Sequence, residues 1–205
     1  MKKLLSFVVA LVVVITMISI PAYAHENTNI VVNGNGSEAE LQVSEAMSFS
    51  EMVACYAEST GATCQEALTV FPKEQRASHG TYRVLSVTLN VTSQYNPYIE
   101  FYCNTEEYGH YWAIKNIYST QLVRSDGNMS KQFSGTLEVW LRSAYEIEFS
   151  INGDFYNNGT TSCTNGGEGG IGLGGYFNIS YAASQTMSTN HYKYYYDHRT
   201  VAFQQ

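Results

Sequence analysis

The stretch that decides the fold is LEVWLRSAYEIEFSI, residues 137–151, in which apolar and polar residues alternate on either side of a short break. This period of two predicts two strands, each with one buried face. A three-residue loop at 143–145 sets Leu141 opposite Ile147, whereas a two-residue turn would set Leu141 opposite Glu146. Because a one-residue slip turns every side chain to the other face, burial favours the three-residue loop. The same register pairs Val139 with Phe149 and Leu137 with Ile151.

The polar face of this hairpin is the best candidate for a binding surface. Its predicted members include Glu138, Trp140 opposite Glu148, and Arg142 opposite Glu146. An aromatic plate beside hydrogen-bonding charges suits the binding of sugar rings. The alternative is that another element covers Trp140 and that its indole N–H is bonded internally. The candidate ligand-binding residues are therefore Glu138, Trp140, Arg142 and Glu148.

Further alternating segments extend the pattern in both directions. They lie at residues 85–91, 99–103, 111–123, 133–141, 177–181 and 192–203. About seven strands with short turns, and no regular alternation of strands and helices, predict a mainly β fold built as an antiparallel β-sandwich. A barrel is the alternative arrangement.

Two short helices are predicted in front of the strands. Ser48 with Glu51, and Thr63 with Glu66, have the spacing of capping boxes. The helices would form a hairpin over residues 48–72, at the start of a single β-rich domain that covers residues 48–205.

The first 24 residues have the pattern of a bacterial-style signal peptide. Lys2 and Lys3 precede an apolar run over residues 4–20, and Ala22-Tyr23-Ala24 is a small-x-small cleavage site. The alternative is an uncleaved membrane anchor, since the run approaches the length that a spanning helix needs. The cleavage site favours a secreted, extracellular protein.

Charge limits the partners of the chain that would remain. The full sequence has 11 basic and 18 acidic residues, and residues 1–24 hold two lysines and no acid, which leaves a net charge of −9. Such a surface repels phosphate backbones and anionic membranes, so nucleic acid is not an expected partner and no stable membrane anchor is expected after cleavage. Residues 25–47 are polar and are predicted to be a flexible leader.

The four cysteines agree with an oxidising compartment. Cys55, Cys64, Cys103 and Cys163 allow three connectivities, of which we favour Cys55–Cys64 with Cys103–Cys163. The second bridge would tie a strand to a glycine-rich loop and stabilise the fold by about 4 kcal/mol in the chain-entropy treatment. A zinc site is the weaker alternative, because no C-x-x-C spacing is present.

Enzyme signatures are sparse. The sequence contains no His-Glu-x-x-His and no Gly-x-Ser-x-Gly motif, and neither a metal nor a cofactor is predicted. Two enzymatic hypotheses remain as alternatives. The first is a polysaccharide hydrolase that uses carboxylates such as Glu146 and Glu148. The second is a copper oxygenase that chelates the metal through His25 at a new N-terminus. A third class is a membrane-active antagonistic protein, using the apolar residues of the glycine-rich segment 170–174.

Export, aromatic-rich strands and the lack of a catalytic motif favour a non-enzymatic binding module. We expect its partner to be a glycan or an extracellular protein. Saccharide binding would centre on Trp140 and the charged residues beside it.

Overall fold

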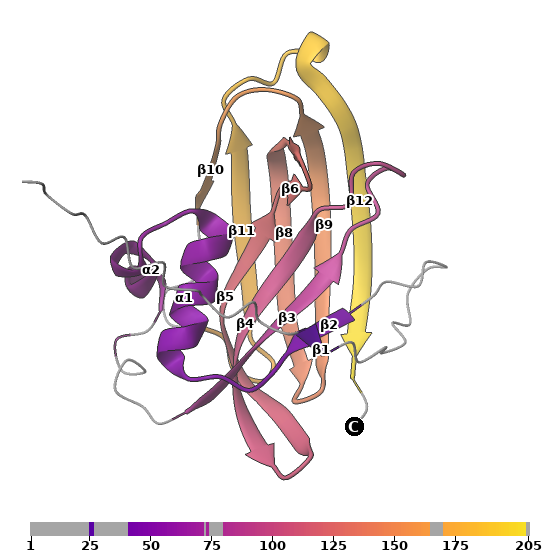
Figure 1. Ribbon diagram of the computed structural model, residues 1–205. Helices are drawn as coiled ribbons and strands as arrows, with labels where there is room; N and C mark the ends of the chain where they lie inside the picture. Colours follow the sequence, from indigo (N-terminus) through magenta and orange to yellow (C-terminus); the bar gives the residue numbers. More distant parts are fainter. Residues whose placement is uncertain (1–24, 27–40, 72, 74–79, 165–169, 204–205) are drawn as a thin grey trace, which may run out of the picture.

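The computed structural model describes residues 25–26, 41–71, 73, 80–164 and 170–203. Within these ranges it contains two five-stranded antiparallel sheets and two α-helices (Figure 1). The predicted signal peptide and residues 27–40 of the predicted leader lie outside the described residues.

The two sheets stack face to face and are not closed into a barrel, which confirms the predicted β-sandwich. The first sheet, in spatial order, consists of β1 (His25–Glu26), β2 (Leu41–Ser44), β3 (Thr81–Thr88), β4 (Tyr98–Tyr108) and β5 (Tyr111–Val123). The second consists of β10 (Thr161–Thr164), β11 (Tyr176–Ala183), β8 (Gln132–Ser143), β9 (Glu146–Tyr156) and β12 (His191–Ala202). A small ribbon of β6 (Ser125–Asp126) and β7 (Met129–Ser130) connects them in the chain.

The estimate of about seven strands was too low. The elements it missed are short, and β2 lies in the segment whose polar composition predicted a leader. Leu41 and Val43 of β2 are buried in the sandwich core, so this part of the segment is a strand of the first sheet.

The β8–β9 hairpin has the predicted register. Leu141 pairs with Ile147, and Trp140 with Glu148. The loop prediction was wrong in detail: Ser143 pairs with Glu146, and the register shifts between Leu141 and Ser143. Arg142 is the extra residue of this bulge, so it does not lie opposite Glu146. A bulge before a two-residue turn keeps the apolar side chains on the inner face as well as a three-residue loop would.

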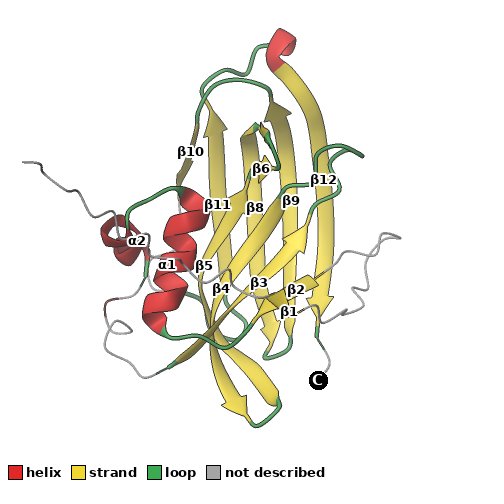
Figure 2. Ribbon diagram, in the orientation of Figure 1, coloured by secondary structure: helices red, strands yellow, loops and turns green. Residues whose placement is uncertain are grey.

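The helices form a third layer on the first sheet, on the side that faces away from the second sheet (Figure 2). They are α1 (Phe49–Thr60) and α2 (Cys64–Val70). Ser48 and Thr63 cap them, and each forms the predicted capping box with the glutamate three residues later. Gly61 ends α1 with a φ of 70°, a left-handed conformation that glycine adopts without strain.

The outward residues of the first sheet explain why the helices pack there. They are large and apolar or aromatic, and they join the helices in a second core of Met47, Phe49, Met52, Val53, Tyr56, Ala57, Ala67, Phe71, Tyr82, Val84, Tyr102 and Tyr118. This aromatic-rich core buries surface that an uncovered sheet would expose to water.

The predicted disulfides are not formed. No two of the four cysteines lie at disulfide distance. Cys103 is buried between the sheets on β4, whereas Cys163 is exposed on the edge strand β10, where it pairs with Tyr181. The thiol of Cys55 lies 4.0 Å from the sulfur of Met47, and Cys64 begins α2 at the surface. Cys103 and Cys163 belong to different sheets, which the sequence spacing alone did not indicate.

Candidate functional site

The four candidate residues lie on the outward side of the second sheet. We use "outer face" for the outward side chains of β8, β9, β11 and β12. Both α-helices pack on the first sheet, so neither covers this face. The outward residues alternate with buried ones along each strand: Glu138 and Trp140 flank Val139 on β8, and Glu148 precedes Phe149 on β9. Glu138, Trp140 and Glu148 therefore share this face, and Arg142, in the bulge of β8, reaches Glu148 from the same strand as Trp140.

Trp140 is half-buried among its neighbours on this face. Its ring centroid lies 5.0 Å from that of Tyr176, which pairs with it from β11, at an interplanar angle of 31°. The guanidinium carbon of Arg142 lies 5.3 Å from the same ring centroid. Trp140 thus packs against Tyr176 and Arg142. The ring of Tyr176, 42 % exposed, is the more accessible of the two aromatic rings. Sequence reasoning did not identify Tyr176.

Charged groups surround this aromatic pair. The Nε of Arg142 donates to Oε2 of Glu148 at 2.5 Å, and Nε2 of His198 lies 2.8 Å from Oε1 of the same carboxylate. The hydroxyl of Tyr176 donates to Glu138 at 2.7 Å. The bond from Arg142 lowers the pKa of Glu148, and the contact with His198 acts in the same direction. Glu148 is therefore an ionised, oriented hydrogen-bond acceptor, whereas a glycosidase general acid needs a raised pKa.

A second aromatic cluster lies toward the other end of the outer face. Tyr194 and Tyr196 on β12 are 54 % and 57 % exposed. They pair with Asp154 and Asn152 of β9, and the hydroxyl of Tyr194 donates to the side-chain oxygen of Asn152 at 2.9 Å. The sequence YKYYYD around them places tyrosines at successive positions, so the pattern did not reveal which of them face outward.

Polar residues fill the surface between the two clusters. The cross-strand row of Asn178, Glu138 and Ser150 lies between them, and the next row, Ser180, Thr136 and Asn152, ends at Tyr196. On β9, the partner of Trp140 and the partner of Tyr194 are six residues apart, which corresponds to about 20 Å along the strand. The outer face is thus an elongated surface with aromatic rings at both ends and hydrogen-bonding groups between them.

The structure gives less support to the metal-binding and membrane-active hypotheses. The side chain of His25 lies outside the described residues. In the described part of the chain, no group of three or more His, Cys, Asp or Glu residues is placed to hold a metal ion. In the glycine-rich segment, Ile171 is buried and bridges to Ile117, which leaves Leu173 as the exposed apolar side chain. Among the described helices, none has the length and apolar character to cross a membrane.

Comparison of the chain with known proteins found no similar protein. No protein-family model, curated protein sequence or solved structure matches the chain.

Proposed function

We propose that the protein is a secreted, non-catalytic binding module whose outer face holds a glycan chain. The observation that supports this most directly is the spacing of exposed tyrosines, Tyr176 at one end and Tyr194 and Tyr196 at the other, on a sheet face that neither helix covers. Aromatic rings provide large, rigid apolar plates for the C–H faces of sugars, and their polar tips add hydrogen bonds.

The polar groups of the face suit the hydroxyls of a saccharide. Carboxylates and amide oxygens accept hydrogen bonds, and the amide nitrogens of Asn152 and Asn178 donate them. Arg142 and His198 hold Glu148 in place, so little side-chain freedom is lost when a ligand binds this acceptor.

The negative charge of the protein limits which glycans it is proposed to bind. Glu138, Glu148 and Asp154 lie on the outer face, and residues 25–205 carry a net charge of −9. An anionic polymer would be repelled by this surface. The proposed ligand is therefore a neutral or amino-sugar polysaccharide rather than a uronate or phosphate-rich polymer.

The test is retention of residues 25–205 on a panel of neutral, amino-sugar and anionic polysaccharides, followed by measurement of Kd. Replacing Tyr196 with Ala removes an exposed ring with little effect on packing, and we expect binding to weaken roughly tenfold. The melting temperature should stay close to that of the parent protein. Trp140→Ala should also weaken binding, with a moderate loss of stability because the ring packs against Tyr176 and Arg142.

Tyr111→Ala is the matched control. Tyr111 is 62 % exposed but lies at the tip of the β4–β5 hairpin, in the first sheet. Its removal should leave the Kd unchanged. Equal losses from Tyr111→Ala and Tyr196→Ala would contradict the assignment to the outer face. If the protein bound no polysaccharide of the panel, a glycan ligand would be excluded in favour of a protein partner.

A further inference from the structure

The exposed tyrosines of the outer face lie at two opposite corners of it. Tyr176 is the first residue of β11, in the same cross-strand row as Glu148. Tyr196 lies on the edge strand β12, in the row of Asn152, and β8 and β9 separate β11 from β12. A line from one tyrosine to the other therefore crosses the four strands obliquely.

The two corners are too far apart for one sugar unit to contact both. Three spacings between neighbouring strands separate β11 from β12, which corresponds to about 14 Å across the sheet. Glu148 and Asn152 are four residues apart on β9, which corresponds to about 13 Å along the strands. Combined at right angles, these components give a diagonal of about 20 Å. A ligand reaches both rings only if it is a chain of several sugar units.

Hydrogen bonds orient the tyrosines at both corners toward the middle of the face. The hydroxyl of Tyr176 donates to Glu138 at 2.7 Å, and that of Tyr194, two residues from Tyr196, donates to Asn152 at 2.9 Å. Each acceptor lies on the adjacent strand, one row nearer the middle than its tyrosine. Because these bonds restrict the rings before a ligand arrives, less side-chain freedom is lost on binding.

Short side chains with hydroxyl groups form the floor between these corners. Ser150 on β9 and Thr136 on β8 are the outward residues at the centre of the face. They leave space above them for sugar rings, and their hydroxyls both donate and accept hydrogen bonds. The other two corners carry Ser180 on β11 and Thr200 on β12. The exposed rings therefore mark one diagonal of the face and not the other.

We propose that one unbranched, extended saccharide chain crosses the outer face along this diagonal, from Tyr176 over Ser150 to Tyr196. This inference rests on the proposed glycan function, to which it adds the route and the kind of chain. A straight route suits polysaccharides whose linkages keep them extended, as the β-linkages of cellulose and chitin do. Tyr176 begins its strand and Tyr196 lies on an edge strand, so both ends of the route reach the margin of the sheet. The face therefore binds internal segments of a long chain.

Contacts with two rings make the affinity depend on the length of the chain. Once one ring holds a sugar unit, contact of the same chain with the second ring is intramolecular, and its effective concentration is high. A hexasaccharide of cellulose or chitin is longer than the diagonal, whereas a disaccharide is shorter. In calorimetric titrations of residues 25–205, we expect cellohexaose or chitohexaose to bind at least about tenfold more tightly than the corresponding disaccharide.

Two serine variants test the route. Ser150→Arg places a long side chain at the centre of the diagonal and should weaken hexasaccharide binding about tenfold. Ser162→Arg adds the same side chain at an exposed position of the edge strand β10, away from the diagonal, and should leave the Kd unchanged. Tyr176→Ala should weaken hexasaccharide binding about as much as Tyr196→Ala does. All four variants should fold, which their melting temperatures check.

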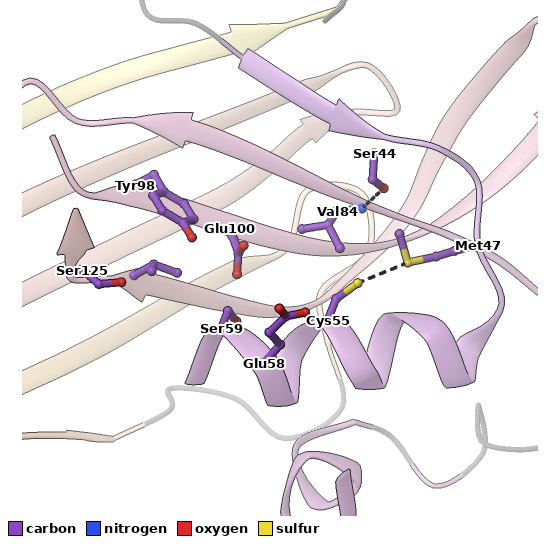
Figure 3. Close-up of a pocket in the computed structure, with 10 residues that line it drawn as sticks. Ser44, Met47, Cys55, Glu58, Ser59, Val84, Tyr98, Glu100 and Ser125 are labelled. Atoms are coloured by element: carbon purple, nitrogen blue, oxygen red, sulfur yellow. Dashed lines mark hydrogen bonds between the residues drawn. The ribbon is translucent and has the colours of Figure 1, made fainter. Parts of the chain in front are cut away.

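A cavity on the other side of the sandwich provides a further control. It lies between α1 and the first sheet, has a volume of about 370 Å³, and its lining includes Glu58 and Tyr98 (Figure 3). This volume is within the range of pockets that hold small molecules, so a short saccharide would fit there. Glu58→Gln changes the cavity at an exposed position of α1 and should leave hexasaccharide affinity unchanged. A loss as large as that of Ser150→Arg would contradict the proposed route.

Failure of the route and failure of the glycan proposal give different results. If Tyr196→Ala weakened hexasaccharide binding while Ser150→Arg and Ser162→Arg had equal effects, the outer face would bind glycan by another route and this inference would be overturned. A loss with Tyr196→Ala but none with Tyr176→Ala would also overturn it, as would equal affinity for the disaccharide and the hexasaccharide. So would the absence of hexasaccharide binding, whereas retention on another polysaccharide of the panel would still support the glycan proposal.

Discussion

Arg199 is a charged side chain buried between the two sheets, 2 % exposed, on the inward side of β12. Its Nε donates to Oδ2 of Asp197 at 2.5 Å, the hydroxyl of Tyr195 donates to the same oxygen at 3.0 Å, and the guanidinium carbon lies 5.6 Å from the ring centroid of Phe149. A buried guanidinium needs these partners because its desolvation is costly.

Replacing Asp197 with Asn should therefore destabilise the protein strongly. The substitution leaves a buried charge without its counter-ion, and we expect a loss of about 3 kcal/mol in the free energy of unfolding, measured by urea denaturation. The double variant Asp197→Asn, Arg199→Met removes both charges and should recover most of that loss. A single variant as stable as the parent would show that the ion pair contributes little.

The sequence predicted which way a side chain points where the alternation within its own strand determines this. The orientation of Trp140 followed from the alternation in residues 137–151. Its ring contact with Tyr176 did not, because that residue arrives from β11, and nothing in the local pattern indicates that β11 pairs with β8. The sequence also contained no sign that Glu58 and Glu100 line one cavity, since the two residues come near each other only after α1 packs on the first sheet.

Between β8 and β9, two glycines face each other. Gly135 pairs with Gly153, and a Cβ added to Gly153 would lie 2.3 Å from the carbonyl oxygen of Ser134 and 2.7 Å from a ring carbon of Phe133. The ring of Phe133 thus occupies the inward space that two side chains would otherwise fill. An aromatic ring beside glycine is a known way to stabilise a strand that contains it.

Gly153→Ala should consequently cost about 2 kcal/mol in the free energy of unfolding, because the new methyl group overpacks the core and backbone atoms must move. Gly127→Ala is the control: nothing lies within 4 Å of the added Cβ there, and its φ of 55° predicts a smaller cost from backbone strain alone. Chemical denaturation of both variants tests the ranking. A larger loss for Gly127→Ala would contradict the packing argument.

The length and regularity of an element decided how well its sequence predicted it. β5 has the predicted bounds, Tyr111–Val123, and both capping boxes are present. Strand β10 escaped prediction because Thr161-Ser162-Cys163-Thr164 lacks an apolar alternation. Its pairing with β11 comes from the tertiary fold rather than from local propensity.

At the scale of the whole molecule, the two sheets differ in what covers them. The first sheet presents aromatic residues to α1 and α2. The second sheet presents polar residues and tyrosines to solvent. This asymmetry leaves the second sheet as the one whose outward side chains neither helix covers.

The positions of the cysteines give a prediction for the molecule as a whole. The thiolate is the form that reacts with alkylating agents, and burial raises the pKa of the Cys103 thiol well above its ordinary value. Cys64 and Cys163 are exposed. When the native protein, purified without reductant, is treated with iodoacetamide, we expect rapid labelling of Cys64 and Cys163, with Cys103 protected until guanidinium unfolds the chain.

Mass spectrometry of the peptides that contain Cys163 and Cys103 decides the outcome. Labelling of Cys163 before unfolding, and of Cys103 after unfolding without reductant, would agree with the separation of these residues onto different sheets. If both required reduction as well as unfolding, the Cys103–Cys163 bridge inferred from the sequence would exist. Strand β10 would then have to pack differently, because Cys103 lies inside the core and Cys163 on an edge strand.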